Sequence, residues 1–432
     1  MNVAILTLGT RGDVQPYVAL GAGLAEAGHE VTLVTGKGFE GLVAGRGLRS
    51  AALDVDPLEL AQSQEGRAAL RSPRAALRVA RGLMPAMRRM LVDQWEAVAS
   101  LHADAVVYHP KALGGYHVAE ALGIPGFLAL ASPALSPTRE FPSPLLPLPD
   151  LGAALNRLSY GAFFRSITLP YRRMVNRWRE ETLGLPALPL LASELELRGE
   201  PVPRLYPCSP RVVPVPSDWD ARSTMTGYWF LDQGKGWQPP EELTEFLQDG
   251  PLPVFVGFGS AAPDPKGSRA AAIAALERLG LRGVLATGRR GTAGPGTIEI
   301  EGAPHDWLFP RMAAVVHHGG AGTTAEGLRA GKPTAVFPSN FGDQLFWGKR
   351  VRALGAGPEP VPQRRLTAEG LAVAIRAITE DGRMRRRAAG VGEGIRAEDG
   401  IARAVEIVAG RTSEGTPYKR SSGDEPSRRL GE

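Results

Sequence analysis

The chain has 432 residues, which predicts two or three domains of ordinary size. Apolar residues make up 43% and charged residues 22%, which excludes a mostly disordered or fibrous protein. The net charge of +5 comes from 50 basic and 45 acidic residues, so nucleic-acid binding is disfavoured. The lone cysteine, Cys208, excludes an intramolecular disulfide, and no apolar run is long enough to span a bilayer. The N-terminus resembles a buried strand rather than a signal peptide, so we expect a cytoplasmic protein.

The first half of the chain alternates strand-like and helix-like segments. Short apolar runs predict strands, and apolar residues at helical spacing predict helices. We expect strands at 3–8, 31–34, 105–108 and 126–130, and helices at 14–26 and 115–122. This order predicts a doubly wound α/β sheet. Six prolines between Ser132 and Pro149 predict a long irregular loop, which is typical of a functional segment.

A second cluster of prolines, at 201–216, is typical of an interdomain connection. After it the α/β rhythm restarts, with expected strands at 254–256, 283–286, 313–316 and 334–337 and helices at 268–279 and 323–330. We therefore predict an N-terminal domain over 1–205, a linker over 206–225 and a C-terminal domain over 226–395. Residues 396–411 are expected to form a last helix, and 412–432 a disordered tail.

Two stretches contain many arginines and no acidic residue. Seven arginines lie between Glu65 and Asp93, and six lie between Asp150 and Glu180. Both stretches also carry apolar side chains at helical spacing. They predict either solvated helix faces or amphipathic helices that contact an anionic membrane peripherally, and both interpretations stay open.

The strongest local signal is a glycine-rich turn that joins an expected strand to an expected helix. It runs His318-Gly319-Gly320-Ala321-Gly322-Thr323-Thr324. Amides at the start of a helix bind anions, and glycines let an oxyanion approach the backbone. The hydroxyl of Thr323 and the ring of His318 add donors, and Glu326 is placed to accept from a ribose hydroxyl. The pattern predicts a site for a diphosphate that carries a ribose; a tight structural turn is the alternative.

Two other nucleotide motifs fail on detail. A Walker A loop is excluded because Gly331-Lys332 is followed by Pro333 and comes after the helix. Gly9-Thr10-Arg11-Gly12 lacks the glycine spacing of the nicotinamide dinucleotide fingerprint.

Two aspartates stand where ligands gather in such folds. Asp13 follows the first strand and precedes a helix with Pro16 in its expected first turn, which suits an N-cap or a general base for an acceptor hydroxyl. Asp343 also suits an N-cap, but with Gln344 it offers bidentate hydrogen bonds to the vicinal hydroxyls of a sugar. The carboxyl ends of parallel strands line the ligand crevice, which favours the chemical role for Asp13.

These motifs together resemble a known family. The glycine-rich turn with Glu326 and Asp343-Gln344 is similar to the signature of Leloir glycosyltransferases, which include plant secondary-metabolite and bacterial antibiotic enzymes. Three further segments resemble the sterol 3-beta-glucosyltransferase branch; they are residues 9–16, 226–232 and 304–310. The resemblance covers residues 1 to about 410 and is weakest at 50–100 and 135–210.

The resemblance implies the GT-B fold, in which two Rossmann-like domains face an interdomain cleft. The N-terminal domain would bind the acceptor, the C-terminal domain the nucleotide sugar, and the last helix would pack back toward the N-terminal domain. Carried onto this sequence, the catalytic base is Asp13, and the donor-binding residues are Ser260, His318, Gly319, Gly320, Gly322, Thr323, Glu326, Asp343 and Gln344.

The chain departs from the plant enzymes in two places. No histidine lies between Val3 and Asp13, where the plant enzymes carry their base, so His109 is a candidate partner of Asp13 or a satisfied polar group. Ile300 stands near the position of the tryptophan that stacks on uracil in the plant enzymes, which leaves UDP and dTDP donors open.

We therefore predict an inverting, metal-independent transferase that moves a hexose, glucose from UDP-glucose, onto a hydroxyl of a lipophilic acceptor such as a sterol. No cofactor is expected beyond the sugar nucleotide, and no clustered pattern predicts a metal site. The alternatives are transfer to a polyketide, macrolide or other aglycone from a dTDP-sugar, a nucleotide-sugar epimerase, and a non-catalytic relative with a decayed site.

Overall fold

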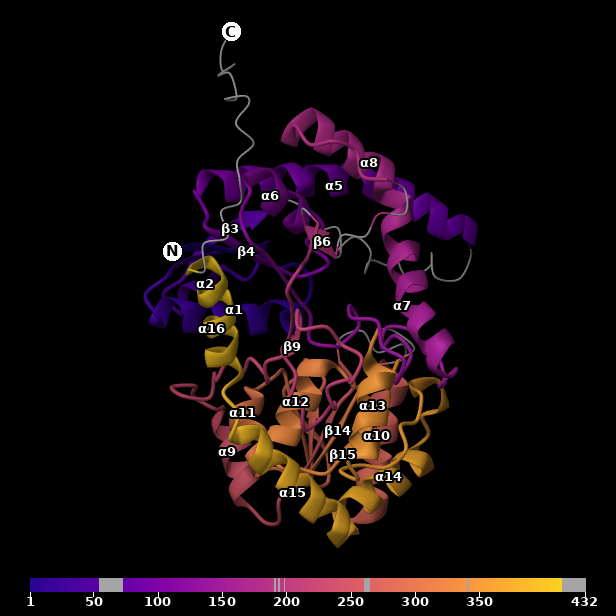
Figure 1. Ribbon diagram of the computed structural model, residues 1–432. Coiled ribbons are helices and arrows are strands. Elements are labelled where there is room, and N and C mark those ends of the chain that lie inside the picture. The colour runs from indigo at the N-terminus through magenta and orange to yellow at the C-terminus, as the bar shows by residue number, and fades with distance from the viewer. Residues whose placement is uncertain are drawn as a thin grey trace.

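The computed structural model describes residues 1–53, 73–189, 192, 195–197, 199–259, 265–339 and 342–413. Two α/β domains are stacked one above the other, with the N-terminal domain at the top of Figure 1. Three predictions fall outside the described residues: Arg67 and Arg71 of the first arginine-rich stretch, Ser260 of the donor site, and residues 414–432 of the predicted tail.

The N-terminal domain is built on a seven-stranded parallel sheet of order β3-β2-β1-β4-β5-β8-β9. Its strands are β1 (Asn2–Leu6), β2 (Glu30–Gly36), β3 (Arg49–Leu53), β4 (Ala105–Tyr108), β5 (Gly126–Ala129), β8 (Arg204–Tyr206) and β9 (Ser223–Met225). The central strands are apolar throughout because helices cover both faces of the sheet. A short hairpin, β6 (Glu196–Leu197) and β7 (Glu200–Pro201), lies apart from this sheet.

The helices of this domain are α1 (Arg11–Glu26), α2 (Glu40–Ala44), α5 (Pro73–Ser100), α6 (Gly114–Leu122), α7 (Ala153–Thr168) and α8 (Arg172–Trp178). No helix or strand lies between β5 and α7, as the prolines of that segment predict. Strand β9 lies within the range predicted as a linker and pairs with β8, so the N-terminal sheet continues to Met225.

The C-terminal domain has a six-stranded sheet of order β12-β13-β11-β10-β14-β15, parallel except for β12. Its strands are β10 (Val254–Gly257), β11 (Gly283–Ala286), β12 (Gly291–Gly294), β13 (Thr297–Ile300), β14 (Ala314–His317) and β15 (Thr334–Val336). Its helices are α9 (Glu241–Gln248), α10 (Pro265–Leu279), α11 (His305–Leu308), α12 (Ala321–Arg329), α13 (Gln344–Ala353), α14 (Ala368–Glu380) and α15 (Gly382–Arg396).

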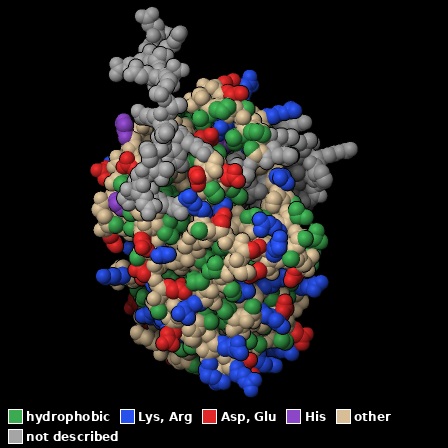
Figure 2. Space-filling model, viewed as in Figure 1, with side chains coloured by type: hydrophobic (Ala, Val, Ile, Leu, Met, Phe, Trp, Pro, Cys, Tyr) green, Lys and Arg blue, Asp and Glu red, His purple; other side chains and the backbone are tan. Residues whose placement is uncertain are grey.

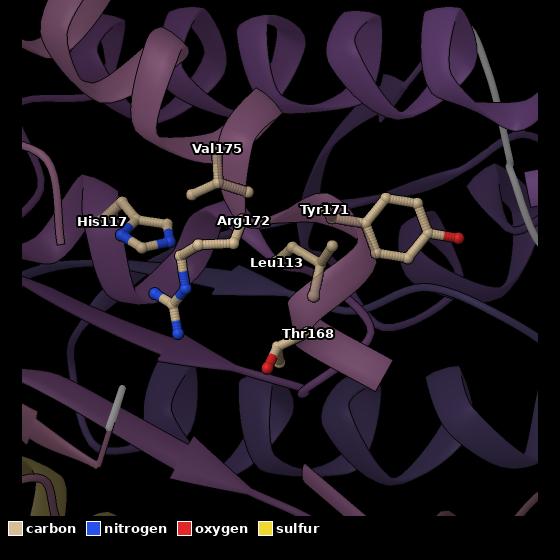
Figure 3. A pocket seen from close by; sticks show the side chains of 6 residues that line it. All are labelled: Leu113, His117, Thr168, Tyr171, Arg172 and Val175. Atoms are coloured by element: carbon tan, nitrogen blue, oxygen red, sulfur yellow. The ribbon is translucent and has the colours of Figure 1, made fainter. Parts of the chain in front are cut away.

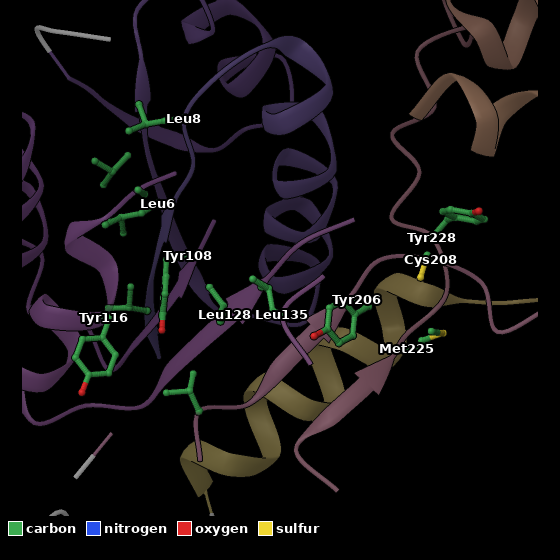
Figure 4. Packing of buried hydrophobic residues seen from close by; sticks show 14 of the residues in the cluster. Leu6, Leu8, Tyr108, Tyr116, Leu128, Leu135, Tyr206, Cys208, Met225 and Tyr228 are labelled. Carbon is green, nitrogen blue, oxygen red and sulfur yellow. The ribbon is translucent and has the colours of Figure 1, made fainter. Parts of the chain in front are cut away.

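The last helix, α16 (Gly400–Ser413), returns to the N-terminal domain and packs against α1 (Figure 1). Its Ala404 and Val408 are fully buried in the same cluster as Val18 and Leu20 of α1. Another buried cluster runs from Leu6 and Tyr108 through Tyr206 and Cys208 to Tyr228 (Figure 4) and also includes Trp347 of α13. The two domains therefore share continuous apolar packing.

Helix α1 begins earlier than predicted. Thr10 is its N-cap, and Asp13 is the third helical residue rather than the N-cap. Pro16 consequently lies inside the helix instead of in its first turn, where it removes one backbone hydrogen bond. The earlier start is stabilised by Thr10 and Asp13, which form a capping box.

Candidate active site between the two domains

Asp13 lies at the carboxyl end of the N-terminal sheet, at the start of α1. Its Oδ2 accepts hydrogen bonds from the Thr10 amide at 2.8 Å and the Thr10 hydroxyl at 3.0 Å. Its backbone carbonyl accepts from the Thr7 hydroxyl at 2.8 Å. The carboxylate is thus oriented by the helix cap, with Oδ1 directed away from it.

Lys111 pairs with the other oxygen of this carboxylate, a contact that the sequence analysis missed. Its Nζ lies 2.7 Å from Asp13 Oδ1, and the two side chains are 38% and 19% exposed. Burial by itself raises the pKa of Asp13, but the Lys111 ammonium and the Thr10 amide together hold that pKa below its ordinary value. Asp13 is therefore ionised at neutral pH, as a general base must be.

His109, predicted as a partner of Asp13, is buried and lies beside the same oxygen. Its Nδ1 accepts from the Lys111 amide at 3.0 Å, so the neutral ring carries its proton on Nε2, which is 3.6 Å from Asp13 Oδ1. Burial lowers the pKa of His109 to about 4, against the raising effect of Asp13. The ring is therefore neutral at physiological pH and packs edge-on against Tyr17.

The glycine-rich turn leads from β14 into α12, as predicted. Gly319 has a φ of +92°, and a Cβ there would lie 2.7 Å from the Gln344 carbonyl oxygen. Only glycine fits this conformation and this close approach. The Gly319 amide donates to His317 Nδ1 at 2.9 Å, so it is not available to a phosphate, contrary to the expectation for the whole turn.

The remaining donors of the turn fit an anion. Helix α12 has no side-chain cap at its N-terminus, so the amides of its first turn, including Gly322 and Thr323, remain for a ligand. A Cβ on Gly322 would meet nothing within 4 Å, whereas one on Gly320 would lie 2.7 Å from His318 Nε2. The buried Nδ1 of His318 has no hydrogen-bond partner among the described residues. An oxyanion at this helix start would satisfy the free amides, while the buried His318 ring also interacts with the Gly257 backbone.

Glu326 is buried in α12 and has two acidic neighbours. Burial raises its pKa to about 7, an effect that Arg329 opposes and Asp306 and Asp232 strengthen. Arg329 lies 3.6 Å from Glu326 and also binds Asp232 in the segment between the domains. A hydrogen bond from a ribose hydroxyl would reduce the cost of burying the Glu326 carboxyl group.

Asp343 and Gln344 are partly committed to local bonds. Asp343 caps α13 and its Oδ2 accepts from the Trp347 indole at 2.8 Å. The Gln344 Oε1 accepts from the Ser339 amide and hydroxyl, both at 2.8 Å. The Asp343 carboxylate also interacts with the Ser132 hydroxyl, so the Gln344 amide nitrogen is the group left for a sugar, which is narrower than the bidentate pattern predicted.

The two halves of the site face each other across the domain boundary. Burial raises the pKa of Asp343, the Trp347 indole lowers it, and the charge of Asp13 on the other domain raises it again. Arg11, beside Asp13, donates to the side-chain oxygen of Gln233, and the backbone N–H of Gln233 donates to Asp306 Oδ2 at 3.1 Å. Asp306, in the first turn of α11, thus holds the connection between the domains.

One small cavity lies away from these residues. It is lined by Leu113, His117, Thr168, Tyr171, Arg172 and Val175 in the N-terminal domain (Figure 3). Its volume of about 10 Å³ suits one water molecule, not a sugar nucleotide. Within the described ranges, no three His, Cys, Asp or Glu side chains could hold a metal ion, and no helix is long and apolar enough to cross a membrane.

Two family models match the chain. Residues 3–136 match the glycosyltransferase family 28 N-terminal domain, and residues 290–408 match the C-terminal domain described as erythromycin biosynthesis protein CIII-like. Among solved structures, the kitacinnamycin glycosyltransferase matches with a TM-score of 0.71 at 20% identity, covering 95% of this chain and 98% of that one. The calicheamicin glycosyltransferase CalG4 matches with a TM-score of 0.68 at 18% identity, covering 96% and 99%. These matches confirm the predicted GT-B fold.

Curated relatives match nearly the whole length of this chain. A sterol 3-beta-glucosyltransferase of Arabidopsis thaliana is 36% identical over 98% of this chain and 70% of its own length. A second from the same plant is 38% identical over 94% of this chain, which spans 65% of that relative. A sterol 3-beta-glucosyltransferase of Emericella nidulans is 37% identical, but this chain spans only 30% of its length. The chain belongs to the glycosyltransferase family that contains these sterol 3-beta-glucosyltransferases.

Proposed function

We propose that the protein transfers glucose from UDP-glucose to a hydroxyl of a sterol, with inversion at the anomeric carbon. The observation that carries the chemistry is Asp13, which is ionised beside Lys111 and oriented by Thr10. The acceptor class is supported by the 36% identity to a plant sterol 3-beta-glucosyltransferase over 98% of this chain.

The geometry assigns the proton transfer to one oxygen of Asp13. Oδ2 already accepts two hydrogen bonds from Thr10, so Oδ1 is the atom that takes the acceptor proton. Lys111 occupies Oδ1 in the structure, and its half-exposed, flexible side chain has to yield room for the acceptor hydroxyl. The neutral His109 ring faces the same oxygen with an N–H.

The donor half supplies the leaving group's charge stabilisation. As the acceptor oxygen bonds to the anomeric carbon, the bond from that carbon to the phosphate oxygen breaks and the diphosphate leaves with the electron pair. Amides at the start of α12 and the His318 ring would stabilise this charge without a metal ion. Asp343 and Gln344 would hold the sugar, Glu326 the ribose, and Ser260, outside the described residues, the phosphates.

The second candidate is the same transfer from a dTDP-sugar to a secondary-metabolite aglycone. It is favoured by the solved neighbours, one of which, from Streptomyces sp. SF2575, is a complex with thymidine diphosphate. Ile300, near the place of the uracil-stacking tryptophan in plant enzymes, is buried in β13 and presents no stacking surface. The structure thus offers no Ile300 contact that would favour UDP.

One experiment separates these functions. The protein is incubated with UDP-glucose or dTDP-glucose and a panel of sterols and polyketide aglycones, and products are identified by mass spectrometry. A gain of one hexose on a sterol with UDP-glucose supports the proposal, and hexose only on an aglycone supports the second candidate. A rearranged sugar formed without acceptor would instead indicate an epimerase.

We further propose a cytoplasmic enzyme that contacts the membrane peripherally.

A further inference from the structure

Exposed leucines gather on and beside one helix of the N-terminal domain. Among the described residues, seven large hydrophobic side chains are exposed, and four of them belong to α7 or its ends: Leu151, Leu155, Leu158 and Leu169, at 37%, 53%, 65% and 46%. Leu155 and Leu158 lie on one side of α7, since residues three or four apart in a helix are neighbours, whereas Leu151 lies just before the N-cap Gly152. The other three, Val215, Leu252 and Val373, are scattered over the chain.

A second side of α7 is buried against the proline-rich loop that precedes it. Asn156, Ser159 and Tyr160 are 1%, 6% and 3% exposed. The Asn156 amide donates to the Arg139 carbonyl at 3.2 Å, and the Ser143 amide donates to the Ser159 hydroxyl at 2.8 Å. Because these bonds fix the rotation of the helix, the leucine side is held outward.

The loop that α7 holds reaches the donor domain. The Phe141 ring lies 5.9 Å from the Phe346 ring of α13, and Lys349 of α13 donates to the Leu148 carbonyl at 3.2 Å. Helix α13 begins directly after Asp343. The outward leucines are thus linked to the proposed sugar-binding end of the active site through the proline-rich loop and helix α13.

The charge around this side is positive. Arg157, Arg165, Arg173 and Arg177 are exposed, and no acidic residue lies between Asp150 and Glu180. Figure 2 shows hydrophobic and basic side chains side by side on the flank where α7 lies in Figure 1.

Two of the six arginines between Asp150 and Glu180 do not contribute to this exposed positive charge. Arg172 donates to the Ala192 carbonyl, and the buried Arg179 pairs with Glu120 at 2.6 Å. Of the exposed four, Arg157 has Asp218 nearby and Arg177 pairs with Glu181. Arg165 and Arg173 are therefore the best placed to meet an external anion.

We propose that the outward side of α7, with its leucines and Arg165, docks on an anionic phospholipid bilayer together with the exposed Arg173 of the following helix α8. This rests on the proposed function, because a sterol acceptor is dissolved in a bilayer and has to leave it to reach Asp13. Leucines enter the acyl region while arginines remain at the headgroups and bind their phosphates. The combination of apolar and basic side chains on one side fits a lipid surface, and the loop under α7 connects that surface to the site.

Vesicle co-sedimentation of the full chain tests the docking. Phosphatidylcholine vesicles with and without phosphatidylserine are compared for the wild type, Leu155→Ser/Leu158→Ser, Arg165→Gln/Arg173→Gln and the control Leu252→Ser/Val373→Ser. We expect the leucine variant to lose about tenfold or more in partitioning, and the arginine variant to lose several-fold, only with phosphatidylserine. The control should bind like the wild type. Wild-type binding that is absent, or that is unchanged by phosphatidylserine or by the leucine substitutions, would overturn the docking.

Two further measurements separate the outcomes. Transfer to sterol dispersed in cyclodextrin should be equal in the wild type and the leucine variant, while transfer to vesicle-embedded sterol should fall in the variant. If the wild type transfers nothing to dispersed sterol, the proposed function fails, and co-sedimentation still decides the docking. Light scattering that shows concentration-dependent dimers, lost in the leucine variant, would assign this side to a second copy and overturn the bilayer.

Discussion

Two glycines of the same turn should respond in opposite ways to alanine. At Gly319, alanine has to adopt a φ of +92° and place its Cβ 2.7 Å from the Gln344 carbonyl oxygen and 2.8 Å from Val336 Cγ1. Backbone strain of this kind costs about 1–3 kcal/mol, and overpacking against a rigid backbone costs about 1–3 kcal/mol more. The free energy of unfolding should therefore fall by about 2–6 kcal/mol.

At Gly322, three residues later, the change is expected to stabilise. Its Cβ would meet nothing within 4 Å, and the residue is helical. Alanine is favoured over glycine in a helix by about 1 kcal/mol, so the free energy of unfolding should stay level or rise. The open space beside Gly322 is where we place a phosphate, however, so this variant should bind the sugar nucleotide several-fold more weakly.

Urea unfolding followed by circular dichroism and calorimetric titration with UDP-glucose measure the two effects separately. Gly319→Ala should lower the unfolding midpoint, and Gly322→Ala should lower only the donor affinity. Equal stability of Gly319→Ala and the wild type would refute the argument from backbone conformation. Undiminished donor affinity of Gly322→Ala would refute the placement of the diphosphate at this helix start.

Three further predictions concern the charged groups of the site. Asp13→Asn should lower kcat by about 10²–10⁴-fold while calorimetry shows donor binding retained, because it removes only the base. Lys111→Met should move the acidic limb of the kcat/KM profile to higher pH. Loss of the ammonium raises the pKa of Asp13, and a protonated Asp13 cannot act as a base. The control Lys332→Met, just beyond the end of α12, should leave the acidic limb unchanged. The KM for the sugar nucleotide should rise as pH falls below about 7, where Glu326 gains a proton, and Glu326→Gln should abolish this pH dependence. If KM depended on pH in the same way in that variant and in the wild type, Glu326 would not bind the ribose.

Eight strands, β1, β2, β4, β5, β10, β11, β14 and β15, were predictable because each is a short, mainly apolar and mainly buried run, whereas β3, β8 and β13 were not predicted. The bounds predicted for 105–108 and 283–286 are those of β4 and β11. Strand β9 was missed because its three residues, Ser-Thr-Met, carry little apolar signal and fall among prolines. Only pairing with β8 makes it a strand, and such long-range pairing is not visible in a local pattern.

The site was predictable in its positions but not in its polar contacts. The rule that carboxyl ends of adjacent parallel strands meet at one edge places His109 near Asp13, and the structure agrees. The same rule applied to Lys111, two residues further on, would have found its pairing with Asp13. The bond from the Gly319 amide to His317 could not be found this way, because it depends on the backbone path of the turn.

The connection between the domains couples the two halves of the proposed reaction. Its Asp232 pairs with Arg329 at 2.5 Å, and Arg329 faces Glu326, where we place the ribose. Its Gln233 accepts from Arg11, two residues before Asp13. A single short segment thus contacts the helix that holds the base and the helix that holds the donor. Since the reacting atoms must meet within about 3–3.5 Å, we expect this segment, with α16 and the apolar packing between the domains, to influence the separation on which the rate depends.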